Sequence, residues 1–311
     1  MRCRSLMLRG PRDLEWVVEE LARPGPGDIL VRTIAGAVSI GSELPHYLGT
    51  GRHSVPDIYP RMTGYESVGT VVACGPEVQR LRTGDRVFSF YGHRTHAVVA
   101  EGRAIPLPPD IGDRLALLAI LSCDVAKGIR AVQPWIGEPV LVTGAGTIGL
   151  LAVWTLRRRG IIDIDVLEPL STRRELALRL GARRAFTPDE LPQSGDRYIL
   201  GFECSSRNAA FAALQASMRH EGRICVLADG NLEPLALTSY FHEKELRVLA
   251  SSDGWDYTQH ATWYFAMARA QGTALEAIFD HEIPSSDLAQ TFERMALGDI
   301  RPTKVFVRYD E

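Results

Sequence analysis

The chain has 311 residues, of which 45% are hydrophobic, and its 35 basic and 38 acidic residues give a formal net charge of −3. This length favours two domains, and the balanced charge argues against a nucleic-acid or membrane surface that works by bulk charge. Five scattered cysteines without CxxC spacing argue against a disulfide framework and a cysteine-cluster metal site. No signal-peptide or membrane-spanning run is visible, so we expect a cytoplasmic protein.

The first third of the sequence predicts short strands separated by glycine- and proline-rich turns. The expected strands are Asp28–Ile34, Ser67–Ala73, Arg86–Phe90 and Ala97–Ala100. Many short strands with such turns are typical of a barrel-like β-domain.

From about residue 113 the pattern changes to alternating strands and helices. The expected strands are Pro139–Thr143, Ile164–Leu167, Tyr198–Phe202 and Arg223–Leu227, and the expected helices are Arg114–Leu121, Ile148–Arg159 (amphipathic), Thr172–Leu180 and Ala209–Met218. This alternation predicts an α/β domain with a doubly wound parallel sheet covered on both faces. We assign residues 118–251 to it. Residues 252–311, with helices near Thr262–Ala270 and at Asp287–Leu297 and a strand at Lys304–Arg308, are expected to rejoin residues 1–117.

A glycine-rich turn indicates a dinucleotide site. Gly144, Gly146 and Gly149 follow the strand PVLVT directly and open a helix. Glycines at this spacing permit a tight turn, close approach of the backbone to a pyrophosphate, and close contact between helix and strand. The first helical residues, Thr147 and Ile148, would present free N–H groups and the positive end of the helix dipole to the phosphates.

Glu168 ends the next strand, 19 positions after Gly149. An acid at this point accepts hydrogen bonds from the adenine ribose and repels the 2′-phosphate of NADP, so we expect NAD(H). Arg173 and Arg174 follow on a helix, and one of them could reach a 2′-phosphate, so NADP(H) is not excluded.

Several segments resemble the medium-chain dehydrogenase/reductase superfamily, among them PGPGDILVR, GYESVGTVV, GDRVF, VLVTGAGTIG, RRELALRLGA, FHEKELRV and DHEIPSSDLAQTFERM. The resemblance implies a GroES-like catalytic β-domain interrupted by a Rossmann domain, which matches the order of lobes above. It also implies a homodimer, in which the strand Leu246–Ala250 could pair across a two-fold axis.

The positions that carry catalytic zinc in many members of this superfamily lack suitable ligands here. The resemblance places Ile40, Tyr65 and Ala119 where zinc enzymes have their three ligands, and none of these side chains is a usual zinc ligand. We therefore expect no zinc. The combination SIGSE…YLG…TGYESVG is similar to a zinc-free branch that includes hydroxyethyl-chlorophyllide dehydrogenases of bacteriochlorophyll synthesis, which implies a tetrapyrrole alcohol as one candidate substrate.

Without zinc, side chains must polarise the reacting oxygen and move its proton. The resemblance places Ser42 where family members relay the alcohol proton, although it could simply cap a turn. Tyr65 could donate a hydrogen bond or only pack, Glu66 could act as a base, and His46 could carry a proton to solvent.

Three further residues have less specific predictions. Cys123 lies where the superfamily approaches the nicotinamide, although a buried cysteine is more often core. For His93 and His96, in the sequence GHRTH, we expect substrate-facing or surface roles rather than metal binding.

Three functions compete at this point. The leading prediction is a zinc-independent NAD(H)-dependent alcohol dehydrogenase or ketone reductase that acts on a small molecule. The alternatives are an enoyl or quinone reductase, whose conjugated substrate supplies its own electron sink, and a non-catalytic dinucleotide-binding protein.

Overall fold

The computed structural model describes residues 1–51, 58–191, 196–228, 233–270 and 272–309. The chain forms two compact units. Unit 1 comprises Met1–Leu118 and Phe279–Glu311, and unit 2 comprises Ala119–Ile278. The first boundary lies close to the expected one, whereas the second lies at residue 279 instead of 252. The difference arises because the helices of residues 257–276 pack within unit 2.

Unit 2 contains a parallel sheet. Its strands are β9 (Val140–Thr143), β10 (Ile164–Leu167), β11 (Arg184–Phe186), β12 (Tyr198–Glu203), β13 (Met218–Val226) and β14 (Arg247–Ala250). They lie in the order β11-β10-β9-β12-β13-β14, with every pair parallel. The winding reverses between β9 and β12, and in doubly wound folds ligands bind in the crevice outside the carboxyl ends of the strands at such a point.

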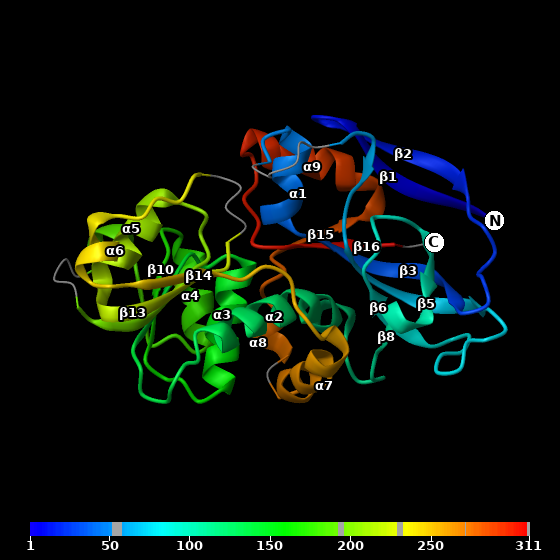
Figure 1. Ribbon diagram of the computed structural model, residues 1–311. Helices are drawn as coiled ribbons and strands as arrows, with labels where there is room; N and C mark the ends of the chain where they lie inside the picture. The colour runs from blue at the N-terminus through cyan, green and yellow to red at the C-terminus, as the bar shows by residue number, and fades with distance from the viewer. Residues whose placement is uncertain (52–57, 192–195, 229–232, 271, 310–311) are drawn as a thin grey trace. The chain divides into compact units, whose positions relative to one another are not determined.

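Helices cover both faces of this sheet, as the alternating pattern predicted (Figure 1). The helical elements described in unit 2 are α2 (Asp113–Ala131), which begins in unit 1, α3 (Thr147–Arg158), α4 (Ser171–Leu180), α5 (Asn208–Ser217), α6 (Ser239–Glu243), α7 (Tyr257–Ala268), α8 (Gly272–Glu276) and the 3₁₀ turn η2 (Pro188–Glu190). The sequence suggested an amphipathic α3, but residues 149–156 are all buried. Its outer face is covered because Trp154 packs edge-on against Trp263 and Tyr264 of α7.

Unit 1 is rich in strands, as predicted. They are β1 (Arg2–Gly10), β2 (Asp13–Glu20), β3 (Asp28–Val38), β4 (Arg61–Met62), β5 (Glu66–Cys74), β6 (Arg86–Ser89), β7 (His96–Ala100), β8 (Ile105–Pro106), β15 (His281–Pro284) and β16 (Val305–Arg308). The main sheet has the order β15-β16-β3-β5-β6-β8, with β7 also paired to β3, and a smaller sheet has the order β2-β1-β4. The helical elements are α1 (Ile40–Leu48), α9 (Leu288–Leu297), η1 (Glu101–Arg103) and η3 (Ser285–Asp287).

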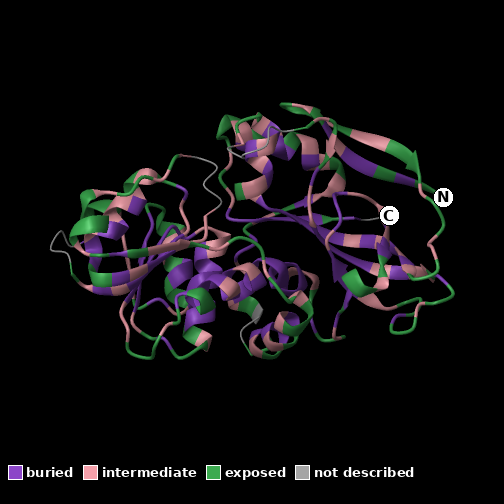
Figure 2. Cartoon of the chain, in the orientation of Figure 1, coloured by how far each residue is buried: buried purple, intermediate pink, exposed green. Residues whose placement is uncertain are grey.

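The return segment completes unit 1. Strand β16 pairs antiparallel with β3, with Val305 opposite Val38, and both valines are fully buried in one core with Phe292 of α9. The central strands of each unit, such as β3, β9 and β10, are largely buried (Figure 2). None of the described helices combines the length and the apolar character needed to cross a membrane.

Candidate functional site

The turn from β9 into α3 has the geometry that its glycines require. Gly144 has a positive φ of 86°, which favours glycine. A Cβ on Gly149 would lie 1.9 Å from the carbonyl oxygen of Gly144, so that position has no room for a side chain. A Cβ on Gly146 would meet nothing within 4 Å. The space beside Gly146 is therefore open to a ligand.

The N-terminus of α3 is suited to an anion. The N-cap residue is Gly146, which has no side chain of its own to cap this end. The first N–H groups of an α-helix lack partners inside the helix and lie at the positive end of its dipole. Gly146, Thr147 and Ile148 are partly exposed. A phosphate group at this end would gain hydrogen bonds and favourable electrostatics.

Glu168 lies beside the glycine turn. Its carboxylate accepts hydrogen bonds from the backbone N–H groups of Ala145 (2.7 Å) and Leu170 (3.0 Å), and the residue is 4% exposed. The guanidinium of Arg174 donates to the carbonyl oxygens of Glu168 (2.9 Å) and Pro169 (2.7 Å). Arg174 is thus fixed at the carboxyl end of β10, and Arg173 precedes it on α4.

Glu203, which was not predicted as a site residue, ends β12. This strand lies beside β9 on the side opposite to β10. Its carboxylate accepts hydrogen bonds from Thr143 Oγ1 and from the backbone N–H groups of Ser205 and Ser206, each at 2.7 Å. Burial raises the pKa of this carboxyl above its ordinary value. Glu203 ties the ends of β9 and β12 together. The sequence feature that could have identified Glu203 is its place directly after the predicted apolar strand Tyr198–Phe202.

In unit 1, hydroxyl groups gather around Tyr65. The phenol donates a hydrogen bond to Ser39 Oγ at 2.6 Å, and the side chain of Ser42 is a second hydrogen-bond partner. Burial, followed by the charge of Glu66, raises the pKa of Tyr65 well above 10, and the two serines only partly oppose this. The phenol is therefore protonated at neutral pH and can act as a hydrogen-bond donor. We call Tyr65, Ser39 and Ser42 the hydroxyl cluster.

A buried histidine lies next to the hydroxyl cluster. His93 Nε2 is 3.1 Å from Glu43 Oε2, and Nδ1 is 3.4 Å from the hydroxyl of Tyr309. The other oxygen of Glu43 accepts the backbone N–H of Ser39 at 2.7 Å. His93 is only 1% exposed, so of its two expected roles the surface role is wrong, and the substrate-facing role stays a prediction. Its ring lies between Glu43 of α1 and Tyr309 near the C-terminus. His96 is half-buried on β7.

Glu66 and His46 also have partners. Glu66 Oε1 lies 2.8 Å from Lys304 Nζ, and both side chains are at most 1% exposed. Its carboxylate is therefore held in a buried ion pair. His46 lies one turn after Ser42 on α1, half-buried, with Nδ1 2.9 Å from Arg61 Nη1.

The donor set does not fit a zinc ion. Ile40 and Tyr65 are poor zinc ligands, and in the described ranges no three His, Cys, Asp or Glu side chains gather in a group that could hold a metal. Cys123, in α2, packs against Gly254, where an added Cβ would meet its Sγ at 2.6 Å. Burial raises the pKa of this thiol to about 11, so it is neutral at physiological pH.

Comparisons with known proteins agree with this architecture. Residues 25–108 match the alcohol dehydrogenase GroES-like domain. The chain is 28% identical over 330 residues to L-threonine 3-dehydrogenase of Deinococcus deserti, covering 91% of this chain and 93% of the relative. It is 26% identical to the enzyme of the same name from Pectobacterium atrosepticum, with 97% and 92% covered. The fold resembles 2R,3R-butanediol dehydrogenase from Bacillus subtilis with a TM-score of 0.83 at 19% identity, covering 99% and 100% of the two chains.

Proposed function

We propose that this chain, an oxidoreductase of the medium-chain dehydrogenase/reductase type, transfers hydride between NAD(H) and an alcohol or ketone without a catalytic metal. The observation that carries the proposal is the hydroxyl cluster around Tyr65. The resemblance in sequence implies that Tyr65 takes the place of a histidine ligand of zinc enzymes. The relatives named L-threonine 3-dehydrogenase support a secondary alcohol as the group that is oxidised. A tetrapyrrole alcohol stays a prediction from short motifs.

Unit 2 would hold the dinucleotide. The open space at Gly146 and the positive end of the α3 dipole suit the pyrophosphate. Glu168 uses two of about four acceptor positions of its carboxylate on backbone N–H groups, which leaves others for ribose hydroxyls. Its negative charge disfavours a 2′-phosphate, which supports NAD(H) over NADP(H). When bound, the nicotinamide supplies or accepts the hydride.

Unit 1 would handle the proton. In the direction of reduction, the phenol of Tyr65 donates a hydrogen bond to the carbonyl oxygen and stabilises the negative charge that develops there. For this step the O–H of Tyr65 must turn from Ser39 Oγ toward the substrate. The hydroxyls of Ser39 and Ser42 then donate to the phenolic oxygen, which eases transfer of its proton to the carbonyl oxygen. His46, one turn from Ser42 on a half-buried surface, is our candidate for proton exchange with solvent. Glu66 is left out of this path because its carboxylate is held by Lys304 in a buried ion pair.

The first test is oxidation of NADH, followed at 340 nm in the presence of EDTA, with one panel of ketones and one of enones and with the products identified. Reduction of ketones to alcohols supports the proposal. Turnover of enones alone would assign the chain to the C=C reductases. Tight NADH binding without any turnover would favour a non-catalytic protein, and loss of activity in EDTA would overturn the metal-free mechanism.

Variants test the role of the phenol. We expect Tyr65→Phe to lower kcat for ketones by about 100-fold or more, because general acid catalysis commonly contributes 10²–10⁴-fold, while the Kd for NADH is unchanged. Ser42→Ala should have a smaller effect in the same direction. The matched control is Tyr91→Phe, which removes a buried hydroxyl bonded to Thr33 in the same unit. Unchanged turnover in Tyr65→Phe would remove the hydroxyl cluster from the mechanism.

A further inference from the structure

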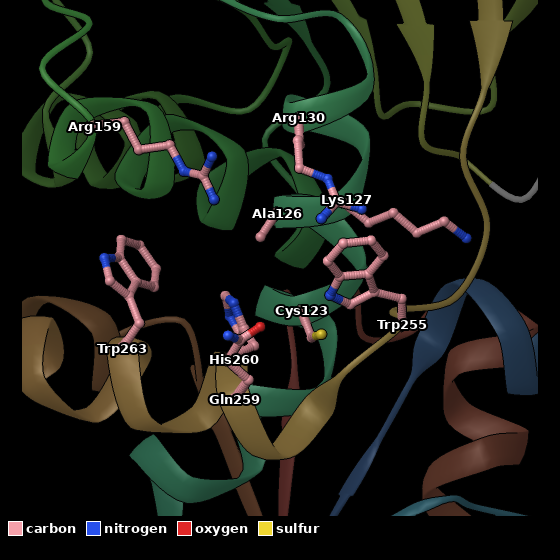
Figure 3. Close-up of a pocket in the computed structure, with 9 residues that line it drawn as sticks. All are labelled: Cys123, Ala126, Lys127, Arg130, Arg159, Trp255, Gln259, His260 and Trp263. Carbon is pink, nitrogen blue, oxygen red and sulfur yellow. The ribbon is translucent and has the colours of Figure 1, made fainter.

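Unit 2 has a cavity that the proposed dehydrogenase function does not use. It has a volume of about 300 Å³ and lies between α2, α7 and the end of α3 (Figure 3). Arg159 is the C-cap residue of α3, whereas the glycine turn lies at the N-terminus of that helix. A helix of this length spans about 18 Å. The cavity is therefore separate from the glycine turn.

Cations face this cavity. Arg130 at the end of α2 and Arg159 at the end of α3 both line it. In the described part of the chain neither guanidinium has an ion pair or a side-chain hydrogen bond; their recorded partners are aromatic rings. The pKa of Arg159 is lowered, first by burial and then by the charge of Arg130. Two neighbouring guanidinium groups thus repel each other and have free N–H donors.

Lys127 adds a third cation, but its charge is partly balanced. Its Nζ donates to the carbonyl oxygen of Ser252 at 2.8 Å, and it acts electrostatically on the carboxyl group of Asp124. Asp124 is itself engaged by the hydroxyl of Tyr257 at 2.8 Å. The charge left without a partner is therefore that of Arg130 and Arg159.

Aromatic rings form the other walls. The guanidinium carbon of Arg130 lies 3.1 Å from the ring centre of Trp255, and that of Arg159 lies 5.7 Å from Trp263. Trp255 is 64% exposed, so much of its surface is open to a ligand. The ring of His260 lies 5.4 Å from that of Trp263. Burial, aided by the charge of Arg159, lowers the pKa of His260 to about 4, which keeps the ring neutral at pH 7.

We propose that this cavity binds a flat organic anion, whose phosphate or carboxylate group is held by Arg130 and Arg159 and whose ring lies against Trp255 and Trp263. Guanidinium groups bind both of these anions through paired N–H donors. Aromatic side chains favour stacking with a flat ring. A volume of about 300 Å³ is at the small end of the range for small-molecule sites.

Calorimetric titration of the full chain tests the proposed anion site. Saturating NAD⁺ is present, so that the dinucleotide site is filled and does not take up the probe. The probes are 1-naphthyl phosphate, 1-naphthoate, inorganic phosphate and 1-naphthol. We expect one naphthyl anion to bind at least 10-fold more tightly than inorganic phosphate and 1-naphthol. Preference for 1-naphthyl phosphate would identify a phosphate ligand, and preference for 1-naphthoate would identify a carboxylate ligand.

Variants locate the binding. Arg130→Ala and Arg159→Ala should each weaken the preferred anion at least 10-fold, and the double variant should abolish binding, with circular dichroism confirming the fold. Arg179→Ala, an exposed arginine of α4, is the matched control and should leave the affinity unchanged. NADH oxidation should persist in all of these variants, which separates this site from the proposed activity. Absence of binding by either naphthyl anion, or unchanged binding in the double variant, would overturn the proposal.

Discussion

The buried ion pair between Glu66 and Lys304 supports a quantitative prediction about stability. The substitution is Lys304→Met, which keeps an unbranched apolar stem of similar shape and removes the ammonium. Both side chains are at most 1% exposed and their charged atoms are 2.8 Å apart. The variant therefore leaves the carboxylate of Glu66 buried without its cation. Loss of one partner of a buried pair typically costs 3–5 kcal/mol, so we expect the free energy of unfolding of unit 1 to fall by about that amount.

Urea titration measures this loss of stability. Pulsed hydrogen exchange and mass spectrometry of peptides from β3 and β5 follow the unfolding of unit 1 separately from that of unit 2. Two controls make the result specific. The double variant Glu66→Gln with Lys304→Met removes both charges and should recover much of the stability. Arg308→Met breaks an ion pair with Glu282 whose side chains are 49% and 41% exposed, and should cost at most about 1 kcal/mol.

The reasoning would be refuted if Lys304→Met cost no more than Arg308→Met. It would also be refuted if the double variant were as unstable as the sum of its two single variants, because the two charges would then act independently.

Three other predictions follow from the same contacts. Gly146→Ala should leave stability nearly unchanged and weaken NADH binding at least 10-fold in a fluorescence titration, whereas Gly149→Ala should cost at least about 2 kcal/mol by overpacking; equal effects on stability would contradict this geometry. Glu168→Gln should raise the ratio of kcat/KM for NADPH over NADH about 10-fold, and an unchanged ratio would remove the charge of Glu168 from cofactor choice. Folding raises the pKa of Asp124 from 3.8 to about 6, chiefly through burial, which favours the protonated form, so its stabilising contribution is present below pH 4 and is lost as the pH rises through 6. Asp124→Asn should therefore raise the free energy of unfolding by about 2–3 kcal/mol at pH 8 and by only about 1 kcal/mol at pH 4.5, and a pH-independent effect would count against this pKa shift.

Local sequence patterns predicted much of unit 2. Its sheet consists of short apolar strands between helices, which local patterns predict well. Its glycine turn is equally local, because the spacing of neighbouring glycines predicts the tight backbone, including the positive φ of Gly144. Helix α1 was missed because Gly41 and Pro45 disfavour a helix by local rules. Packing overrides those rules: Tyr47 lies 5.4 Å from the ring of Phe292, which anchors α1 to α9.

The polar contacts of unit 1 depend on distant pairs that no local pattern encodes. Glu66 and Lys304 are 238 positions apart, and Tyr309 approaches His93 from across 216 positions. From the sequence, Glu66 was a candidate base and His93 was expected to face the substrate or the surface, because Lys304 and Tyr309, which contact them, lie in the return segment. The second boundary between the units was misplaced for a related reason: α7 is held in unit 2 by the edge-on packing of its aromatic residues against Trp154.

The pairing of β16 with β3 has a consequence for biosynthesis. A ribosome adding about 5–20 residues per second needs roughly 10–50 seconds to travel from Glu66 to Lys304, which are 238 positions apart. During that interval one edge of β3 lacks its neighbour and the carboxylate of Glu66 lacks its cation, while the whole of unit 2 is translated. The nascent chain can therefore fold unit 2 first. Unit 1, whose N-terminal part is translated first, is completed last, when β16 pairs with β3.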